Sequence, residues 1–226
     1  MPFQKNDFIE VQFTGKLRDG GVFDSNIKED LEKLHHGHDN PIEAKPFIFA
    51  LGHGMFFKGV EDFLIGKDIG KYEISLDPEN AFGPRDTKLV QVIPLKIFIQ
   101  QNLNPVPGAV FNFDNRVGKV ITSSGGRVIV DFNNPLAGKH VVYNVKVLRK
   151  VTDLNEKIKA FNDFLFRREI KYDIYGKKIT LEVEPELEKF IVLFKDKYRE
   201  ILDLDLEVKL LAVKEVKEIK VEETAQ

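Results

Sequence analysis

The sequence predicts an α+β fold in three parts: an antiparallel sheet with one short helix, a small β-rich insertion, and a C-terminal α/β domain. Apolar and polar residues alternate in several short N-terminal runs, which is typical of half-buried strands. A second group of short strands follows the stretch from Pro84 to Pro94 and contains a glycine turn. Beyond Thr152 the spacing of apolar residues becomes helical. We expect the parts at residues 1–87 with 134–151, at 88–133, and at 152–226.

The first strand is predicted at residues 7–14, where apolar and polar side chains alternate. The Asp-Gly-Gly sequence at 19–21 predicts a hairpin turn into a second strand at Val22, because glycine adopts positive φ at little steric cost. Residues 27–45 are polar and irregular. We expect a long loop there, with one helical turn at LEKL.

A short helix is predicted at residues 59–65, between strands at 47–51 and 72–76. Gly66 should end this helix, because glycine readily adopts the left-handed conformation that follows a last helical turn. The same sheet is expected to resume at 141–147, where apolar residues again recur at every second position.

The insertion at 88–133 is predicted to be β-rich. Two alternating runs flank the Ser-Ser-Gly-Gly turn at 123–126 and predict a hairpin. The segment VIPLKIF at 92–98 fits a helix and an extended chain equally well.

The C-terminal part is predicted to have α-β-α-β order. Asp153 and Glu156 resemble a capping box at the start of the first helix. The expected elements are a helix at 154–165, a strand at 179–183, a helix at 185–201 and a strand from 206. The run VKEVKEIKVEE could extend this last strand or form a helix. The apolar stripe of the first helix is too wide for one packed face, which predicts a homodimer through 152–226 or a second surface for client chains.

Composition limits the possible functions. The 226-residue chain carries 34 Lys and Arg against 36 Asp and Glu, a net charge of −2, which argues against a nucleic-acid partner. The absence of cysteine excludes disulfides and thiolate catalysis. The N-terminal residues lack the apolar core of a signal peptide, and no apolar run approaches the ~20 residues of a membrane helix. We therefore expect a cytoplasmic protein with no membrane partner.

Four segments are informative through their order: FTGKLRDGGVFDSN at 13–26, PFIFALGHG at 46–54, FKGVEDFLIGKDIGKYEISLDPENAFG at 57–83 and FNNPLAGKHVVYNVKVL at 132–148. Together they resemble the FKBP-type peptidyl-prolyl cis/trans isomerases of the SlyD-like branch, in the archaeal long form with an inserted flap domain and an extra C-terminal domain. The resemblance implies an antiparallel half-barrel sheet wrapped on a short helix. It also implies an isomerase that accelerates folding of proline-containing proteins without a cofactor.

Isomerisation of an Xaa-Pro bond requires neither a nucleophile nor a metal. The barrier of roughly 18–20 kcal/mol comes from amide resonance, so a catalyst must bind the twisted amide better than the planar one. The twisted amide is less dipolar, and an apolar site with one or two placed polar groups favours it.

The resemblance places such a site on the residues of the four segments. These residues are Phe13, Phe23, Asp24, Phe47, Phe56, Phe57, Val60, Phe82 and Tyr143, with Leu136 and Ala137 on the rim. Taken singly, each aromatic residue is more often a core residue of a sheet, and an aspartate such as Asp24 more often belongs to a turn. Their joint order favours the site.

Three positions depart from the family pattern. Phe13 and Phe82 stand where the family often has tyrosine, and Val60 stands where it often has tryptophan. Each lost hydroxyl removes a hydrogen bond worth about 0.5–1.5 kcal/mol. An alternative function is therefore a non-catalytic chaperone or a module that binds proline motifs, and turnover of a proline peptide distinguishes the two.

The inserted flap is implied to bind unfolded or partly folded chains that contain Xaa-Pro bonds. Candidate binding residues are Val90, Val92, Ile93, Leu95, Phe98 and Phe111, together with the rim residues Leu136 and Ala137. An insertion of this size cannot bury all of its apolar residues, although part of this set should form a small core.

His35, His36 and His38 lie close together in the predicted loop and could share a metal ion, since imidazole binds nickel, zinc and copper. The alternative, a solvated polar loop, is favoured. We therefore predict neither a metal nor another cofactor.

Overall fold

The computed structural model describes residues 1–34 and 44–211, and its contacts divide the chain into two compact units. One unit contains the described residues of Met1–Phe3, Val11–Phe47 and Phe56–Leu148; the other contains Gln4–Glu10, Ile48–Met55 and those from Arg149 onward. Within the described part of the chain, no helix is long and apolar enough to span a membrane.

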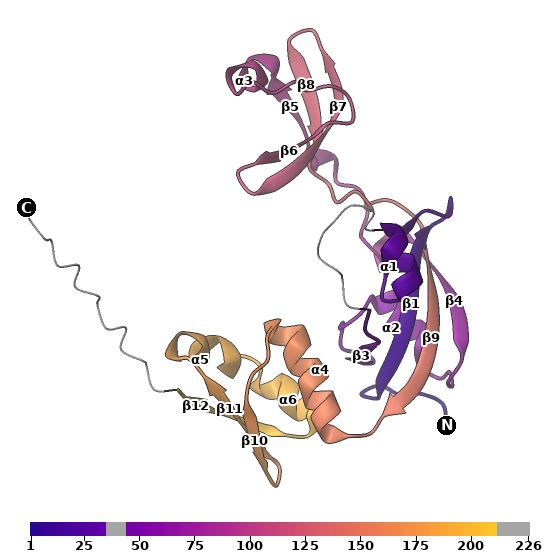
Figure 1. Ribbon diagram of the computed structural model, residues 1–226, viewed down its shortest axis with the longest axis vertical. Coiled ribbons are helices and arrows are strands. Elements are labelled where there is room, and N and C mark those ends of the chain that lie inside the picture. The colour runs from indigo at the N-terminus through magenta and orange to yellow at the C-terminus, as the bar shows by residue number, and fades with distance from the viewer. Residues whose placement is uncertain (35–43, 212–226) are drawn as a thin grey trace, which may run out of the picture. The chain divides into compact units, whose positions relative to one another are not determined.

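Five strands form the main sheet, in the order β2-β1-β9-β4 with β3 paired to β1 (Figure 1). They are β1 (Phe8–Leu17), β2 (Val22–Ser25), β3 (Phe47–Ala50), β4 (Lys71–Leu76) and β9 (Val141–Val151). The β1–β2 hairpin and the β4–β9 pair are antiparallel. The predicted strands are thus present, and the prediction of an α+β fold with antiparallel sheets is confirmed.

The short helix α2 (Lys58–Leu64) packs against this sheet, as the sequence predicts. Its residues Val60 and Leu64 are fully buried. Gly59 permits a close approach, because a Cβ atom at this position would lie 2.5 Å from Cδ2 of Leu76 in β4. The helix therefore reaches the sheet at a point where no larger side chain fits.

Helix α1 (Lys28–Leu34) corrects the expectation of a loop with a single helical turn at 27–45. Acidic residues in its first turn favour a helix N-terminus. One of them, Asp30, accepts a hydrogen bond from Thr14 Oγ1 of β1 at 2.6 Å, and Leu31 is buried. With so few apolar positions, the sequence pattern alone did not indicate the helix.

A second, four-stranded sheet lies within the predicted flap, in the order β5-β8-β7-β6 (Figure 1). Its strands are β5 (Val90–Pro94), β6 (Val110–Phe113), β7 (Arg116–Ser124) and β8 (Arg127–Asp131), all antiparallel to their neighbours. The hairpin expected around residues 123–126 is present as β7 and β8.

Helix α3 (Leu95–Gln100) follows β5 directly. The ambiguous segment 92–98 is therefore extended up to Pro94 and helical after it. Pro94 suits both the end of β5 and the start of α3. It has no N–H to donate on an edge strand, and its fixed φ is compatible with the start of a helix. Phe98 of α3 completes a small core with the buried residues Val120, Val128 and Val130.

The C-terminal region contains more elements than the predicted α-β-α-β order. In chain order they are α4 (Leu154–Phe166), β10 (Tyr172–Tyr175), β11 (Lys178–Val183), α5 (Pro185–Val192), α6 (Lys195–Leu202) and β12 (Asp205–Leu210). The Asp153 side chain accepts the Glu156 N–H at 2.9 Å, so the predicted N-cap of α4 is confirmed.

Two features of this region were not predicted. Strand β10 has only four residues, too few for alternation to be recognised. The expected second helix is divided into α5 and α6 at Leu193–Phe194. Because Phe190, Phe194 and Tyr198 keep a spacing of four across the break, the apolar pattern continues through it and conceals the division.

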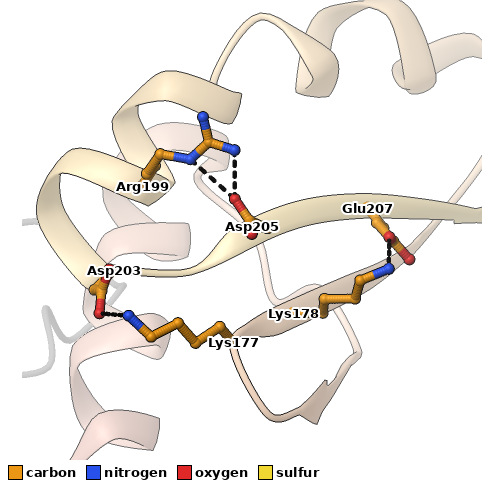
Figure 2. Close-up of polar contacts among 6 residues, drawn as sticks. All are labelled: Lys177, Lys178, Arg199, Asp203, Asp205 and Glu207. Atoms are coloured by element: carbon orange, nitrogen blue, oxygen red, sulfur yellow. Dashed lines mark hydrogen bonds and ion pairs between the residues drawn. The ribbon is translucent and has the colours of Figure 1, made fainter.

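The three strands form a sheet in the order β10-β11-β12, antiparallel at the first pair and parallel at the second. The residues Ile179, Leu181 and Val183 of β11 are buried on one face. The opposite face carries charges, including an ion pair at 2.6 Å between Lys178 and Glu207 of the neighbouring strand (Figure 2).

Two further ion pairs lie beside this sheet (Figure 2). Arg199 of α6 contacts Asp205 at 2.5 Å, and Lys177 contacts Asp203 at 2.5 Å. All of these side chains are exposed, so solvent screens each pair and each contributes little to stability on its own. Their main effect is to keep this face of the sheet polar.

Candidate active site

The predicted aromatic residues meet around Phe13 of β1. The ring of Phe13 lies 4.9 Å from Phe56, 5.9 Å from Tyr143 and 6.5 Å from Phe47, measured between ring centroids. These residues come from β1, the segment before α2, β9 and β3, so the sheet brings together positions far apart in the sequence. Such distances are typical of tilted and edge-to-face aromatic packing.

Tyr143 connects this group to the remaining predicted aromatic residues. Its ring lies 5.3 Å from Phe56, 5.4 Å from Phe57 and 5.8 Å from Phe23. Phe82 then contacts both Phe57, at 4.9 Å, and Phe23, at 5.5 Å. We call these seven residues the aromatic cluster: Phe13, Phe23, Phe47, Phe56, Phe57, Phe82 and Tyr143.

The cluster has a buried base and half-buried walls. Phe13 and Tyr143 are 7% and 0% exposed, and the predicted floor residue Val60 is fully buried. The other five rings are half-buried and keep part of their apolar surface accessible. The predicted rim segment at Leu136–Ala137 lies beside Phe82, because the next residue, Gly138, donates its N–H to Gly83 O at 2.9 Å.

Asp24 supplies a carboxylate at the edge of the cluster, and the Tyr143 hydroxyl donates a hydrogen bond to its Oδ2 at 3.4 Å. Burial raises the pKa of Asp24, while hydrogen bonds from Tyr143 and from the Ser25 N–H lower it in part. Because the pKa is raised in the folded state, the contribution of Asp24 to stability decreases as the pH rises through that pKa. Burial and the nearby Asp24 also raise the pKa of Tyr143, so its hydroxyl stays protonated and remains a donor.

This hydrogen bond changes the expected consequence of having phenylalanine at position 13. The sequence indicates that the aspartate loses a tyrosine partner at position 13, and the structure provides one from β9 instead. Asp24 thus keeps a tyrosine donor, while the phenylalanine at position 13 keeps the base of the cluster apolar.

Gly15 explains how two rings can lie against the backbone of β1. A Cβ atom at this position would lie 2.9 Å from Cζ of Phe23 and 3.0 Å from Cε1 of Tyr143. The register of the β1–β2 pair also shifts between Gly15 and Lys16. A glycine at this irregularity therefore lets Phe23 and Tyr143 pack edge to face.

Sequence reasoning missed Glu61, whose side chain positions part of the cluster. Glu61 lies in the first turn of α2, is 1% exposed, and accepts the N–H of Phe56 at 2.7 Å. A buried carboxylate is retained only where hydrogen bonds compensate its lost hydration. The available signal was a glutamate in the first helical turn, four residues after the second of two adjacent phenylalanines.

The predicted flap residues divide between core and surface. Phe98 is 1% exposed and belongs to the flap core, with Ile93, Leu95 and Phe111 packed against it, so Phe98 is not presented on the surface in this structure. Val92 is 60% exposed. Sequence reasoning did not single out Val117, which is 63% exposed on the same sheet.

The histidine candidates His35, His36 and His38 lie outside the described residues. Among residues 1–34 and 44–211, no group of three or more His, Asp or Glu side chains is placed to hold a metal ion.

Comparison with known proteins agrees with this architecture. The family model described as "FKBP26, IF domain" matches residues 91–136. The chain is 30% identical over 145 residues to the "Short-type peptidyl-prolyl cis-trans isomerase" of Methanocaldococcus jannaschii, a match that covers 64% of this chain and 91% of that protein. It is 31% identical over 151 residues to the "FKBP-type 16 kDa peptidyl-prolyl cis-trans isomerase" of Escherichia coli, with the same coverage.

A third relative, the "FKBP-type peptidyl-prolyl cis-trans isomerase SlyD" of Pasteurella multocida, is 29% identical over 154 residues, or 66% of this chain and 69% of that protein. The chain therefore belongs to the FKBP-type peptidyl-prolyl cis/trans isomerases and is an enzyme of this class. Membership favours the enzyme over the alternative of a non-catalytic binding module.

The Tyr143–Asp24 hydrogen bond leads to a test by titration. Tyr143→Phe should raise the pKa of Asp24 above its value in the unchanged protein, because the carboxylate loses a bond that favours its charged form. The pKa can be measured by NMR titration of the Asp24 side-chain carbonyl. Tyr72→Phe is the matched control, since that hydroxyl donates to Asp68 O instead. If the pKa of Asp24 in Tyr143→Phe is equal to or lower than in the unchanged protein, Tyr143 is not a hydrogen-bond donor to Asp24.

Proposed function

We propose that the aromatic cluster is the site at which this isomerase rotates Xaa-Pro bonds and thereby accelerates the folding of proline-containing proteins. The observation that carries the proposal is the packing of six phenylalanine rings with the buried Tyr143 in one cluster, with Asp24 at its edge. Half-buried rings offer apolar contact to a prolyl ring.

The physical basis is preferential binding of the twisted amide. Rotation about the C–N bond removes conjugation, so the amide becomes less dipolar and depends less on water. Accessible faces of Phe23, Phe57 and Phe82 would replace water around it. Tyr143 and Asp24 add one polar pair, which orients the substrate rather than reacting with it.

We further propose that residues 88–133 act as a chaperone flap that holds unfolded or partly folded chains. In its sheet Val120 and Val130 are buried on one face, which leaves the alternate positions on the other. These positions include Val92, Val110 and Val117, which are 60%, 59% and 63% exposed. Three exposed valines on one sheet face offer apolar contact to an unfolded segment.

The C-terminal region offers a third apolar surface, and we propose that it forms a homodimer. Phe190 and Leu193 are 46% and 75% exposed. Phe190 lies 5.1 Å from Phe194 and 6.3 Å from Phe166, so the exposed ring belongs to an ordered aromatic group. A two-fold pairing would cover this surface, and such dimers are the commonest oligomers.

For the catalytic site, Phe23→Ala should lower kcat/KM for an Xaa-Pro tetrapeptide by about tenfold or more, because an accessible face of the cluster is lost. Asp24→Ala should lower it as well. Phe63→Ala makes the same change at a ring that packs on Tyr72, outside the cluster, and should have little effect. Equal activities in all three variants would reject the site assignment.

For the flap, Val92→Ser combined with Val117→Ser should leave tetrapeptide turnover unchanged and slow the catalysed refolding of a proline-limited protein by about tenfold. Both residues are exposed, so the flap should still fold. Ile69→Ser, at a residue 60% exposed outside the flap, is the control. A parallel loss in both assays would count against a separate role for the flap.

For the C-terminal surface, sedimentation of the full chain at micromolar concentration should show a dimer, and Phe190→Ser combined with Leu193→Ser should convert it to a monomer. Tyr175→Ser, at a residue 89% exposed, should not change the oligomeric state. A monomeric unchanged protein would exclude the dimer and favour a second surface for client chains.

A further inference from the structure

Two connecting segments join the flap sheet to the rest of its unit: residues 83–89 before β5 and residues 132–138 after β8. Backbone hydrogen bonds join these segments at both ends. Phe132 donates its N–H to Leu89 O at 2.9 Å on the flap side, and Gly138 donates to Gly83 O at 2.9 Å on the other. Any movement of the flap must pass through this pair of segments.

Between the two ends, the side chain of Asn133 joins the segments. Its Oδ1 accepts the N–H of Asp86 at 2.8 Å, and its Nδ2 donates to Asp86 O at 2.9 Å. A side-chain amide that engages both the N–H and the C=O of one residue reproduces the pairing of neighbouring strands. Asn133 thus bridges the two segments beyond the end of the flap sheet, at Asp86, the N-cap residue of a short 3-10 helix at Thr87–Leu89.

Asp131 holds Asn133 in this orientation. Its Oδ1 accepts the Asn133 N–H at 3.0 Å and Nδ2 at 2.7 Å, while its Oδ2 contacts Nη2 of Arg85 at 2.6 Å on the opposite segment. Burial acts to raise the pKa of Asp131, but the bonds from Asn133 and the charge of Arg85 outweigh it, and the pKa is lowered. The aspartate therefore stays ionised and joins the amide to a cross-segment ion pair.

We propose that Arg85, Asp86, Asp131 and Asn133 form a latch that stiffens the connection between flap and isomerase site, and that these are positioning residues for isomerisation of protein substrates. The proposal rests on the proposed chaperone role of the flap. A chain held on the flap reaches the aromatic cluster with an effective concentration set by the length and stiffness of the connection. Paired segments keep this concentration high, whereas unpaired segments behave as two flexible linkers.

The latch predicts a difference between substrates. A tetrapeptide reaches the cluster from solution and does not depend on the flap, so its kcat/KM should not change when the latch is opened. A protein substrate held on the flap does depend on it. Asn133→Ala and Arg85→Ala should each lower kcat/KM for refolding of a proline-limited protein by about three- to tenfold. Arg85→Lys keeps the positive charge beside Asp131 and should restore most of the activity lost in Arg85→Ala.

A distance measurement tests the latch without reference to activity. The chain has no cysteine, so spin labels can be placed at Glu73→Cys and Gln101→Cys alone. Both positions are exposed, one on β4 and one at the end of α3. Pulsed electron paramagnetic resonance should show a broader distance distribution in Asn133→Ala than in the labelled protein with Asn133 intact.

The two proposals fail in different ways. An unchanged distance distribution in Asn133→Ala, or unchanged refolding activity together with a broadened distribution, would overturn the latch. Failure of the chaperone role would appear instead as full refolding activity in the Val92→Ser, Val117→Ser variant. Loss of tetrapeptide turnover in Asn133→Ala would also overturn the latch, because it would place the effect in the isomerase site itself.

Discussion

The packing of Tyr143 is the interaction on which the isomerase part of the structure depends. Its ring is fully buried on β9 and touches Phe13, Phe23, Phe56 and Phe57. Without it, the segments that carry these rings would lose their common contact. Its hydroxyl ties the same position to Asp24. One residue therefore links the core of the sheet, the shape of the aromatic cluster and its polar edge.

This arrangement makes the aromatic cluster, which we propose as the prolyl site, both rigid and apolar. Aromatic rings have few rotatable bonds, and edge-to-face contacts fix their orientation. Gly15 and Glu61 hold the cluster from the backbone side, one by leaving room for two rings and the other by binding the N–H of Phe56. The contacts that shape the cluster come from side chains and backbone of the chain itself, and isomerisation needs only a change of environment around an amide.

The sequence predicts most of the fold because its strands alternate clearly. The elements it misses are short or masked by a continuing pattern: α1 has few apolar residues, β10 has four residues, and α5 and α6 share one stripe. The members of the aromatic cluster could be named in advance because four ordered segments identified them together. Their polar support could not be predicted. The bond from Tyr143 to Asp24 spans 119 positions and that from Asn133 to Asp86 spans 47, and periodicity carries no information at such separations.

The aromatic cluster and the flap have opposite requirements: the cluster requires fixed rings, whereas the proposed role of the flap requires an adaptable surface. The flap exposes β-branched residues on a sheet whose core is small, which suits the varied apolar segments that we propose it binds. The cluster must instead keep each ring in place. In our proposal the two connecting segments meet both demands, because they separate the flap from the packing of the cluster and the latch limits its movement. Hydrogen bonds to charged groups suit this position better than apolar contacts, since they are directional and tolerate water. Arg85 and Asp131 supply such a charged bond, and Asp86 takes part through its backbone N–H and C=O, so in our proposal directed bonds rather than a buried core stiffen the connection.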